Sequence, residues 1–270
     1  NFYILAFSIF LIPIKFLFFY IIGSYSLKLF KFKFVDKKEL IFVSLVLGFF
    51  FQYIFILICI FFNLISQILI ILSLLLVIFF FIVIRFKEFK IVKLKYFISL
   101  FFYNEDSFYL KLINYFYLIF LLILIITTAL VPFLEFESFR WLRPVKLMID
   151  NGKFVYTPEE VMFWLPQTAQ FHDAFNLSLG DITYVAADRI IIIVTTGLGL
   201  KILSSIIFKK DFSPLIICFL IANETGEYLI PHTFLKGHLY ACLYGVASLI
   251  LYLKILDGYL NYKQVVLSGL

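Results

Sequence analysis

The sequence of 270 residues contains little of the chemistry that holds small domains together, with three cysteines and three histidines. Cys59, Cys218 and Cys242 all fall inside apolar runs and form no CxxC pair, so neither a disulfide framework nor a zinc site is expected. Internal repeats are missing, as are linkers rich in proline, glycine or serine. Gly197-Leu198-Gly199 lies in an apolar run without a GxxxxGK[ST] pattern, which excludes a phosphate loop.

Apolar residues dominate the chain, at 64% of the sequence with a mean hydropathy of +1.06. A soluble domain is about 45–50% apolar, so water is not the solvent for most of this surface. Phenylalanine contributes 38 residues, an excess that the codon bias of an AT-rich genome explains. Codon bias does not place charges in clusters between apolar runs of spanning length. This arrangement predicts an integral membrane protein.

The apolar runs have the length of membrane-spanning helices, which need about 20 largely apolar residues because lipid offers the backbone no hydrogen-bond partner. The predicted spans are 1–22, 39–62, 66–84, 109–131, 189–208, 213–231 and 238–256, with an eighth beginning near 264. The predicted fold class is therefore all-α, a polytopic transmembrane bundle. Because apolar runs continue to both ends of the chain, we expect a piece of a longer protein.

Lysine and arginine gather in every second connection, after the first, third, fifth and seventh predicted spans. Positive charge is retained on the cytoplasmic side of membranes, so the segments 132–188 and 232–237 are expected outside. The chain then divides into N-terminal spans (1–131), a large extracytoplasmic loop (132–188) and C-terminal spans (189–270). This asymmetry accounts for the net charge of +6, and nucleic acid is not an expected partner.

Function is expected in the loop 132–188, where charge, proline, asparagine and tryptophan appear together for the first time. Apolar spacing predicts an amphipathic helix over 137–151, which places Glu137 and Arg140 on one face and ends at Asn151-Gly152. Such a helix is also typical of a segment that lies in the membrane interface with a solvated ion pair. The spacing alone leaves both interpretations open.

A second short helix is predicted over 166–179, before Gly180. It contains His172 and Asp173, which are neighbours in sequence and therefore point to different faces of a helix. A metal pair is not expected from them. No cofactor is predicted, and a divalent metal is not indicated.

From Phe136 to Asp181 the sequence carries a succession of short elements. They are Phe136-Glu137-Ser138-Phe139-Arg140-Trp141-Leu142-Arg143-Pro144, Asn151-Gly152, Tyr156-Thr157-Pro158, Leu165-Pro166 with Gln170, and Leu179-Gly180-Asp181. This order resembles the polytopic glycosyltransferases of the GT-C superfamily, in particular bacterial protein-mannosyltransferase-like members that use lipid-linked sugars. Those carry W-D-x-x-x-Y-H-L-P, N-G or H-G, Y-x-P, F-P-x-x-x-E and L-G-G-D in this order. The resemblance covers about 130–270.

Four positions differ from the family's pattern. Glu137 replaces the usual aspartate, Leu142 replaces the histidine, and Gln170 replaces the glutamate. His238 stands where many relatives have a second aspartate. Glutamate is longer than aspartate by one methylene and keeps the carboxylate that a general base requires.

The resemblance implies an inverting enzyme of the bacterial cytoplasmic membrane that moves a sugar from a polyprenyl-phosphate donor to a lipid, glycan or protein acceptor. A carboxylate would deprotonate the acceptor hydroxyl, and arginine would contact the lipid phosphate or anchor to headgroups. The candidate site residues are Glu137, or Glu135, as base, and Arg140, Arg143, His172 and His238 for substrate binding.

Two other classes of protein fit the composition. A non-enzymatic subunit of a membrane complex predicts a short complete protein, whereas the transferase predicts several further spans beyond Leu270. A transporter or flippase of lipid-linked sugars predicts broken helices, paired acids at mid-membrane and inverted repeats. The flanking gene sequence distinguishes the first two directly.

Overall fold

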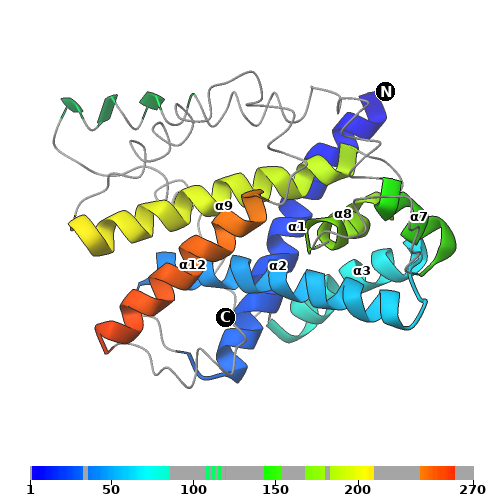
Figure 1. Ribbon diagram of the computed structural model, residues 1–270, viewed down its shortest axis with the longest axis horizontal. Helices are drawn as coiled ribbons and strands as arrows, with labels where there is room; N and C mark the ends of the chain where they lie inside the picture. Colours follow the sequence, from blue (N-terminus) through cyan, green and yellow to red (C-terminus); the bar gives the residue numbers. More distant parts are fainter. Residues whose placement is uncertain are drawn as a thin grey trace.

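The structure is a computed structural model in which every regular element of the described residues is an α-helix (Figure 1). It describes 2–32, 36–85, 143–153, 168–179, 183–209 and 238–258, with a few single positions between 108 and 119. The helices are α1 (Phe2–Leu29), α2 (Lys37–Phe61), α3 (Gln67–Arg85), α7 (Arg143–Asn151), α8 (Thr168–Leu177), α9 (Thr183–Phe208) and α12 (His238–Leu256). The predicted all-α class is confirmed for this part of the chain.

Within the described ranges, three helical segments are long and apolar enough to cross a membrane, as expected of a membrane protein. They are Phe10–Leu29 in α1, Lys37–Phe61 in α2 and Asp188–Phe208 in α9. α3 and α12 contain shorter apolar stretches. These five helices coincide with five predicted spans, and the other predicted spans, 109–131, 213–231 and the one from 264, lie wholly or almost wholly outside the described residues.

Local sequence signals set the helix ends. Asp36 caps the start of α2, where its side chain accepts a hydrogen bond of 2.9 Å from the backbone N–H of Lys38. α7 has Pro144 in its first turn, where the missing N–H needs no partner. It ends before Gly152, whose φ of +66° is the left-handed conformation that closes many helices. The predicted stop at Asn151-Gly152 is therefore confirmed.

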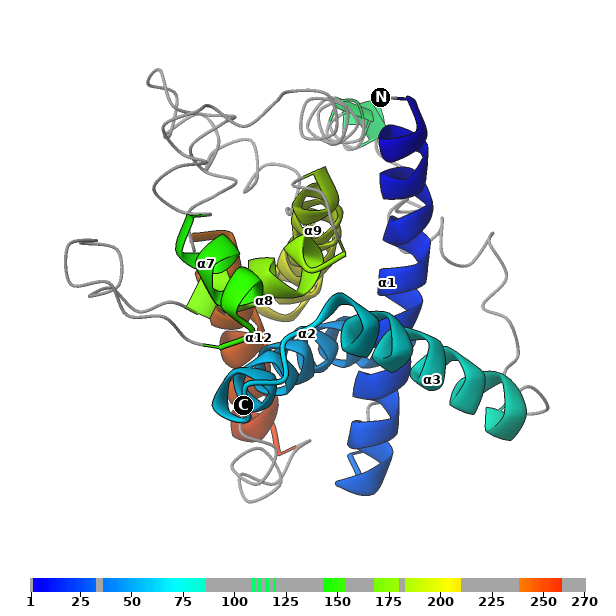
Figure 2. The same ribbon diagram turned by 90° about the vertical axis from the view of Figure 1, so that its right-hand side faces the viewer.

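Among the described helices, α1 and α2 form the most extensive pair, and Figure 2 shows α1 passing directly beside α2. Their backbones meet at two glycines. A Cβ on Gly23 would collide with the backbone of Ser44, and a Cβ on Gly48 would collide with the backbone of Phe19. Small residues of this kind let helices approach closely in membranes, where lipid tails are as apolar as the side chains.

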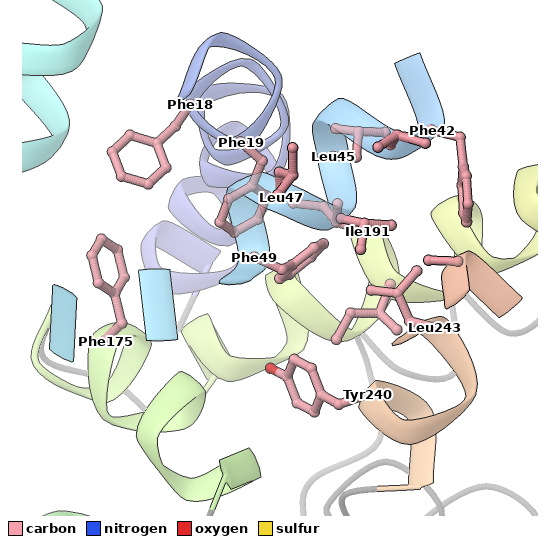
Figure 3. Close-up of a cluster of buried hydrophobic side chains, with 14 of the residues drawn as sticks. Phe18, Phe19, Phe42, Leu45, Leu47, Phe49, Phe175, Ile191, Tyr240 and Leu243 are labelled. Carbon is pink, nitrogen blue, oxygen red and sulfur yellow. The ribbon is translucent and has the colours of Figure 1, made fainter. Parts of the chain in front are cut away.

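α9 packs against α1, α2 and α12 and closes the core of the bundle. Gly199 of α9 faces the ring of Phe42 on α2 and the side chain of Val246 on α12, with no room for a Cβ. Large apolar side chains from α1, α2, α8, α9 and α12 fill the space between the helices (Figure 3).

The two ends of the bundle differ in what they carry. α7 and α8 lie together at one end, while the start of α2 and the ends of α9 and α12 lie at the other (Figure 1). At this second end, Lys254 of α12 and Glu39 of α2 form an ion pair of 2.6 Å. The end with α7 and α8 contains the buried polar residues described next.

Candidate functional site

α8 is a short helix that is buried on every side in its second half. Its residues from His172 to Asn176 are all at most 1% exposed. α8 contacts α2, α7 and α9, and the Phe175 ring lies 5.9 Å from Phe18 of α1. A helix this short is marginal alone, so packing must hold it in place. Polar side chains on α8 therefore need partners inside the bundle.

Asp188, in the second turn of α9, makes polar contacts with three other helices. Its carboxylate forms an ion pair of 2.5 Å with Lys15 of α1. Gln52 of α2 and Asn176 of α8 donate to its Oδ2 at 2.9 and 2.7 Å. Lys15 also donates to the side-chain oxygen of Asn176. The lysine and its carboxylate are completely buried, so each charge depends on the other.

Arg189 and Asp173 form a second buried ion pair beside the first. Nη2 of Arg189 donates to both carboxylate oxygens of Asp173, at 2.8 and 2.7 Å. The guanidinium also lies 5.0 Å from the ring of Tyr240 on α12, within the range of a cation–π contact. This pair joins α8 to α9 and places α12 against both.

His172 occupies the space between α2 and α12. Its ring stacks on Tyr240 with centroids 4.2 Å apart and an interplanar angle of 9°. Gln52 Nε2 lies 3.4 Å from Nδ1 of His172, and the hydroxyl of Tyr244 lies 3.3 Å from Nε2. Because the amide nitrogen has only hydrogens to offer, Nδ1 accepts and Nε2 carries the ring proton.

We call this set of residues the polar centre. Its members are Lys15, Gln52, His172, Asp173, Asn176, Asp188, Arg189, Tyr240 and Tyr244.

Burial sets the protonation of the two titratable residues on α8. It holds the pKa of His172 well below its usual 6.5, and the nearby cations Arg189 and Lys15 lower this pKa further. The imidazole is therefore neutral at pH 7. Burial also raises the pKa of Asp173 to about 6, although the neighbouring Arg189 acts in the opposite direction.

The arrangement of the polar centre suits docking better than metal binding. Its two cations and two carboxylates cancel one another. The Arg189–Asp173 pair attaches α8 to α9, and hydrogen bonds of Asn176 and His172 attach it to α1 and α2. In the part of the chain that the structure describes, no group of three or more histidine, cysteine, aspartate or glutamate side chains is placed to hold a metal ion. The polar centre fixes the α7–α8 segment relative to the long helices.

The predicted site residues have different places in this structure. Glu135, Glu137 and Arg140 lie outside the described residues. Arg143 is the first residue of α7 and is exposed. His172 lies in the polar centre. It contacts Gln52, whereas Asp173 contacts Arg189, so the two neighbours point to different faces of α8, as predicted.

His238 is the first residue of α12, two positions before the Tyr240 ring that stacks on His172. Its side chain is not among those described. The structure therefore places the start of α12, where His238 stands, next to α8, which carries His172.

Sequence reasoning overlooked most of the polar centre. Lys15 and Gln52 are the informative signals, because a lysine and a glutamine inside predicted spans are costly in lipid and usually have a partner or a function. Asp188 and Arg189 stand at the predicted boundary between the loop 132–188 and the span 189–208. Only the position of α8 shows that all four are buried.

Comparison with protein-family models, with curated proteins and with solved structures finds no match to this chain. Functional inference therefore depends on the residues and their geometry.

Proposed function

We propose that this chain belongs to a membrane glycosyltransferase that moves a sugar from a polyprenyl-phosphate donor to an acceptor at the extracytoplasmic face. The observation that supports this most is the docking of α8 onto α1, α2 and α9 through the polar centre. Glu135 and Glu137 precede α7 in the sequence by a few residues. A loop held rigidly by buried ion pairs suits a reaction whose barrier depends on positioning a carboxylate.

The proposal includes seven or eight spans, with α7 and α8 outside and the basic connections in the cytoplasm. Lys37, Lys209 and Lys254 stand near the start of α2 and the ends of α9 and α12, and these helix ends lie together, away from α7 and α8 (Figure 1). The gathering of these lysines at one end agrees with the rule that basic connections remain inside, and α7 itself carries Arg143 and Lys146.

Contact of α7 with the bundle supports the proposed catalytic role of the preceding segment. α7 packs against α8, and the carbonyl of Gly152, just after α7, accepts a hydrogen bond of 3.4 Å from the backbone N–H of Ile65, just before α3. Gln67 of α3 donates to the carbonyl of Leu179 at 3.0 Å. The two ends of the segment from Gly152 to Leu179 are therefore tied to the loop before α3 and to the first residue of α3.

In the proposed mechanism, Glu137 deprotonates the acceptor hydroxyl as the new bond forms at the anomeric carbon. The bond between that carbon and the lipid phosphate breaks, and the phosphate leaves with the electron pair. Arg140 and Arg143 contact the departing phosphate, since guanidinium groups bind phosphate oxygens in pairs. Glu135 is the alternative base.

The test is Glu137→Gln in membranes that contain the full-length protein. We expect sugar transfer from radiolabelled polyprenyl-phosphate sugars to membrane acceptors to fall at least a hundredfold, because general-base catalysis contributes about 10²–10⁴-fold. Protein levels should not change. Glu39→Gln is the matched control: this carboxylate pairs with Lys254 at the opposite end and should leave transfer intact. Wild-type transfer by Glu137→Gln would reject the assignment of the base.

A transporter of lipid-linked sugars is the second candidate, and the buried charges on the long helices α1 and α9 favour it. Intramembrane ionisable residues often line the paths of transported ions and substrates. Translocation of a fluorescent polyprenyl-phosphate sugar in proteoliposomes, without transfer to any acceptor, would support this alternative. A non-enzymatic subunit would show neither activity.

A further inference from the structure

Five buried polar atoms of the polar centre have no hydrogen-bond partner among the described residues. One of them, Oδ1 of Asp188, has an ion pair with Lys15, which leaves four atoms. They are Oε1 of Gln52, Nε and Nη1 of Arg189, and the hydroxyl of Tyr240. All three side chains are at most 2% exposed. Leaving one such atom unpaired destabilises a protein, because the atom loses its hydrogen bond to water and gains none, so folded proteins contain few of them. Their concentration in one place indicates a missing polar group.

The chemistry of these atoms defines the class of that group. Gln52 Oε1 only accepts hydrogen bonds, the two Arg189 nitrogens only donate them, and the Tyr240 hydroxyl does both. The ion pairs Lys15–Asp188 and Arg189–Asp173 already cancel the charge of the polar centre. An added anion would therefore be a buried charge without a counter-ion, which is strongly unfavourable. An uncharged group with several hydroxyls meets all of these requirements.

The side chains that carry the unpaired atoms are connected through direct contacts. The guanidinium of Arg189 lies 5.0 Å from the Tyr240 ring, and that ring stacks on His172. Gln52 contacts Nδ1, at the edge of the same imidazole ring. Figure 3 shows the Tyr240 ring extending away from α12, with its hydroxyl directed away from Leu243. The side chains that carry the unpaired atoms therefore belong to one connected group where α2, α8, α9 and α12 meet.

We propose that Gln52, Arg189 and Tyr240 bind the hydroxyl groups of the sugar carried by the lipid-linked donor. This inference depends on the proposed function and adds the residues that recognise the sugar, as distinct from those that contact the phosphate. Because Arg189 and Tyr240 are fully buried, entry of the sugar requires the start of α12 to move outward from α8 and α9, which the Arg189–Asp173 pair holds together. The mixture of donors and acceptors would select for the pattern of hydroxyls on the sugar ring.

Tyr240→Phe tests the proposal because it removes one unpaired hydroxyl and keeps the ring. We expect the ligand-free variant to be as stable as the wild type or more stable. The probes are polyprenyl phosphate alone and polyprenyl phosphate carrying glucose, mannose, galactose or N-acetylglucosamine, measured by native mass spectrometry of the full chain in nanodiscs. The wild type should prefer at least one sugar-bearing probe over the bare lipid. In Tyr240→Phe the ratio of the two affinities should be about fivefold smaller.

Tyr244→Phe is the matched control, since the Tyr244 hydroxyl already has a partner in His172. This variant should lose stability and keep the preference for the sugar-bearing probe. An unchanged preference in Tyr240→Phe, or an equal loss in Tyr244→Phe, would overturn the proposal. So would lower stability of ligand-free Tyr240→Phe, which would show that ordered water or a protein group already binds the hydroxyl.

The failure of this inference can be separated from failure of the proposed function. If the wild type transfers sugar but Tyr240→Phe leaves the KM for the donor unchanged, the sugar contacts are wrong and the transferase stands. If Glu137→Gln transfers at the wild-type rate, the proposed catalytic base is wrong whatever Tyr240→Phe shows. A wild type that prefers bare polyprenyl phosphate to every sugar-bearing probe also overturns the sugar site.

Discussion

Two neighbouring regions of the α1–α2 interface are stabilised by different forces. At Gly23 and Gly48 the two backbones touch, and only the shape of the surfaces matters. Further towards α8, Lys15 and Gln52 both bond to Asp188 of α9, so charge and hydrogen bonds hold this region. Loss of close packing costs free energy in proportion to the misfit, whereas loss of one partner leaves a whole charge buried. The polar region should therefore tolerate single changes least.

Lys15→Met should produce the largest effect. It leaves Asp188 buried without its cation, and breaking such a pair destabilises proteins by about 3–5 kcal/mol. We expect a clear decrease in the midpoint of thermal unfolding in detergent. Lys15→Met combined with Asp188→Asn should recover most of this stability, because no uncompensated charge remains. The control is Lys146→Met on α7, an exposed position where the change should be within about 0.5 kcal/mol. Equal midpoints for the two single variants would contradict this account.

Gly48→Ala should have an intermediate effect and would measure the region that is held by shape. The added methyl group collides with the backbone of Phe19, and overpacking of this kind costs about 1–3 kcal/mol. Gly245→Ala on α12 is the matched control, because no atom lies within 4 Å of its added Cβ. That variant should be neutral or more stable, since alanine favours helix. The two variants are compared in the same unfolding assay. A neutral Gly48→Ala would show that α1 and α2 are further apart than in this structure.

The pH dependence of stability should show the smallest effect. His172 has a depressed pKa in the folded protein, so the unfolded chain binds the extra proton as the pH falls below about 6.5. Stability contributed by the neutral imidazole is present at pH 7.5 and is lost on acidification. The raised pKa of Asp173 acts with the opposite sign, because the folded state takes up that proton first. Comparison with a variant that lacks His172 but retains Asp173 isolates the first effect.

His172→Phe is that variant, since it keeps a ring to stack on Tyr240 and does not titrate. Between pH 7.5 and 5.5 the wild type should lose up to about 1.4 kcal/mol per pH unit more than the variant. Unfolding midpoints in buffers across this range give the difference. Parallel curves for both proteins would mean that His172 titrates normally and is accessible to water.

The helices could be predicted from sequence because length and apolar content are local properties. Two of their boundaries could not. α1 continues from the predicted end at residue 22 to Leu29, where Ser24 and Ser26 hydrogen bond to backbone carbonyls within the helix. α9 begins at Thr183, six residues before the predicted span, because Asp188 and Arg189 are paired inside the bundle and do not mark its surface.

The loop helices were also predictable in part. The stop at Gly152 follows from the freedom of glycine at positive φ, and the helix over 168–177 lies within the predicted 166–179. Their burial was not predictable, because His172, Asp173 and Asn176 are residues that normally face water. Their partners are on other helices, up to 161 positions away in the case of Lys15 and Asn176.

The sequence by itself determined that the described part of this chain is helical with membrane-spanning character, since a long apolar run in lipid has almost no alternative to helix. It also drew attention to 132–188 as the segment where chemistry is concentrated. Only the tertiary structure decided that α8 enters the bundle and that Lys15, Asp188, Arg189 and Asp173 neutralise one another there. Charge pairing depends on distances between helices, and these distances are set by how the helices pack.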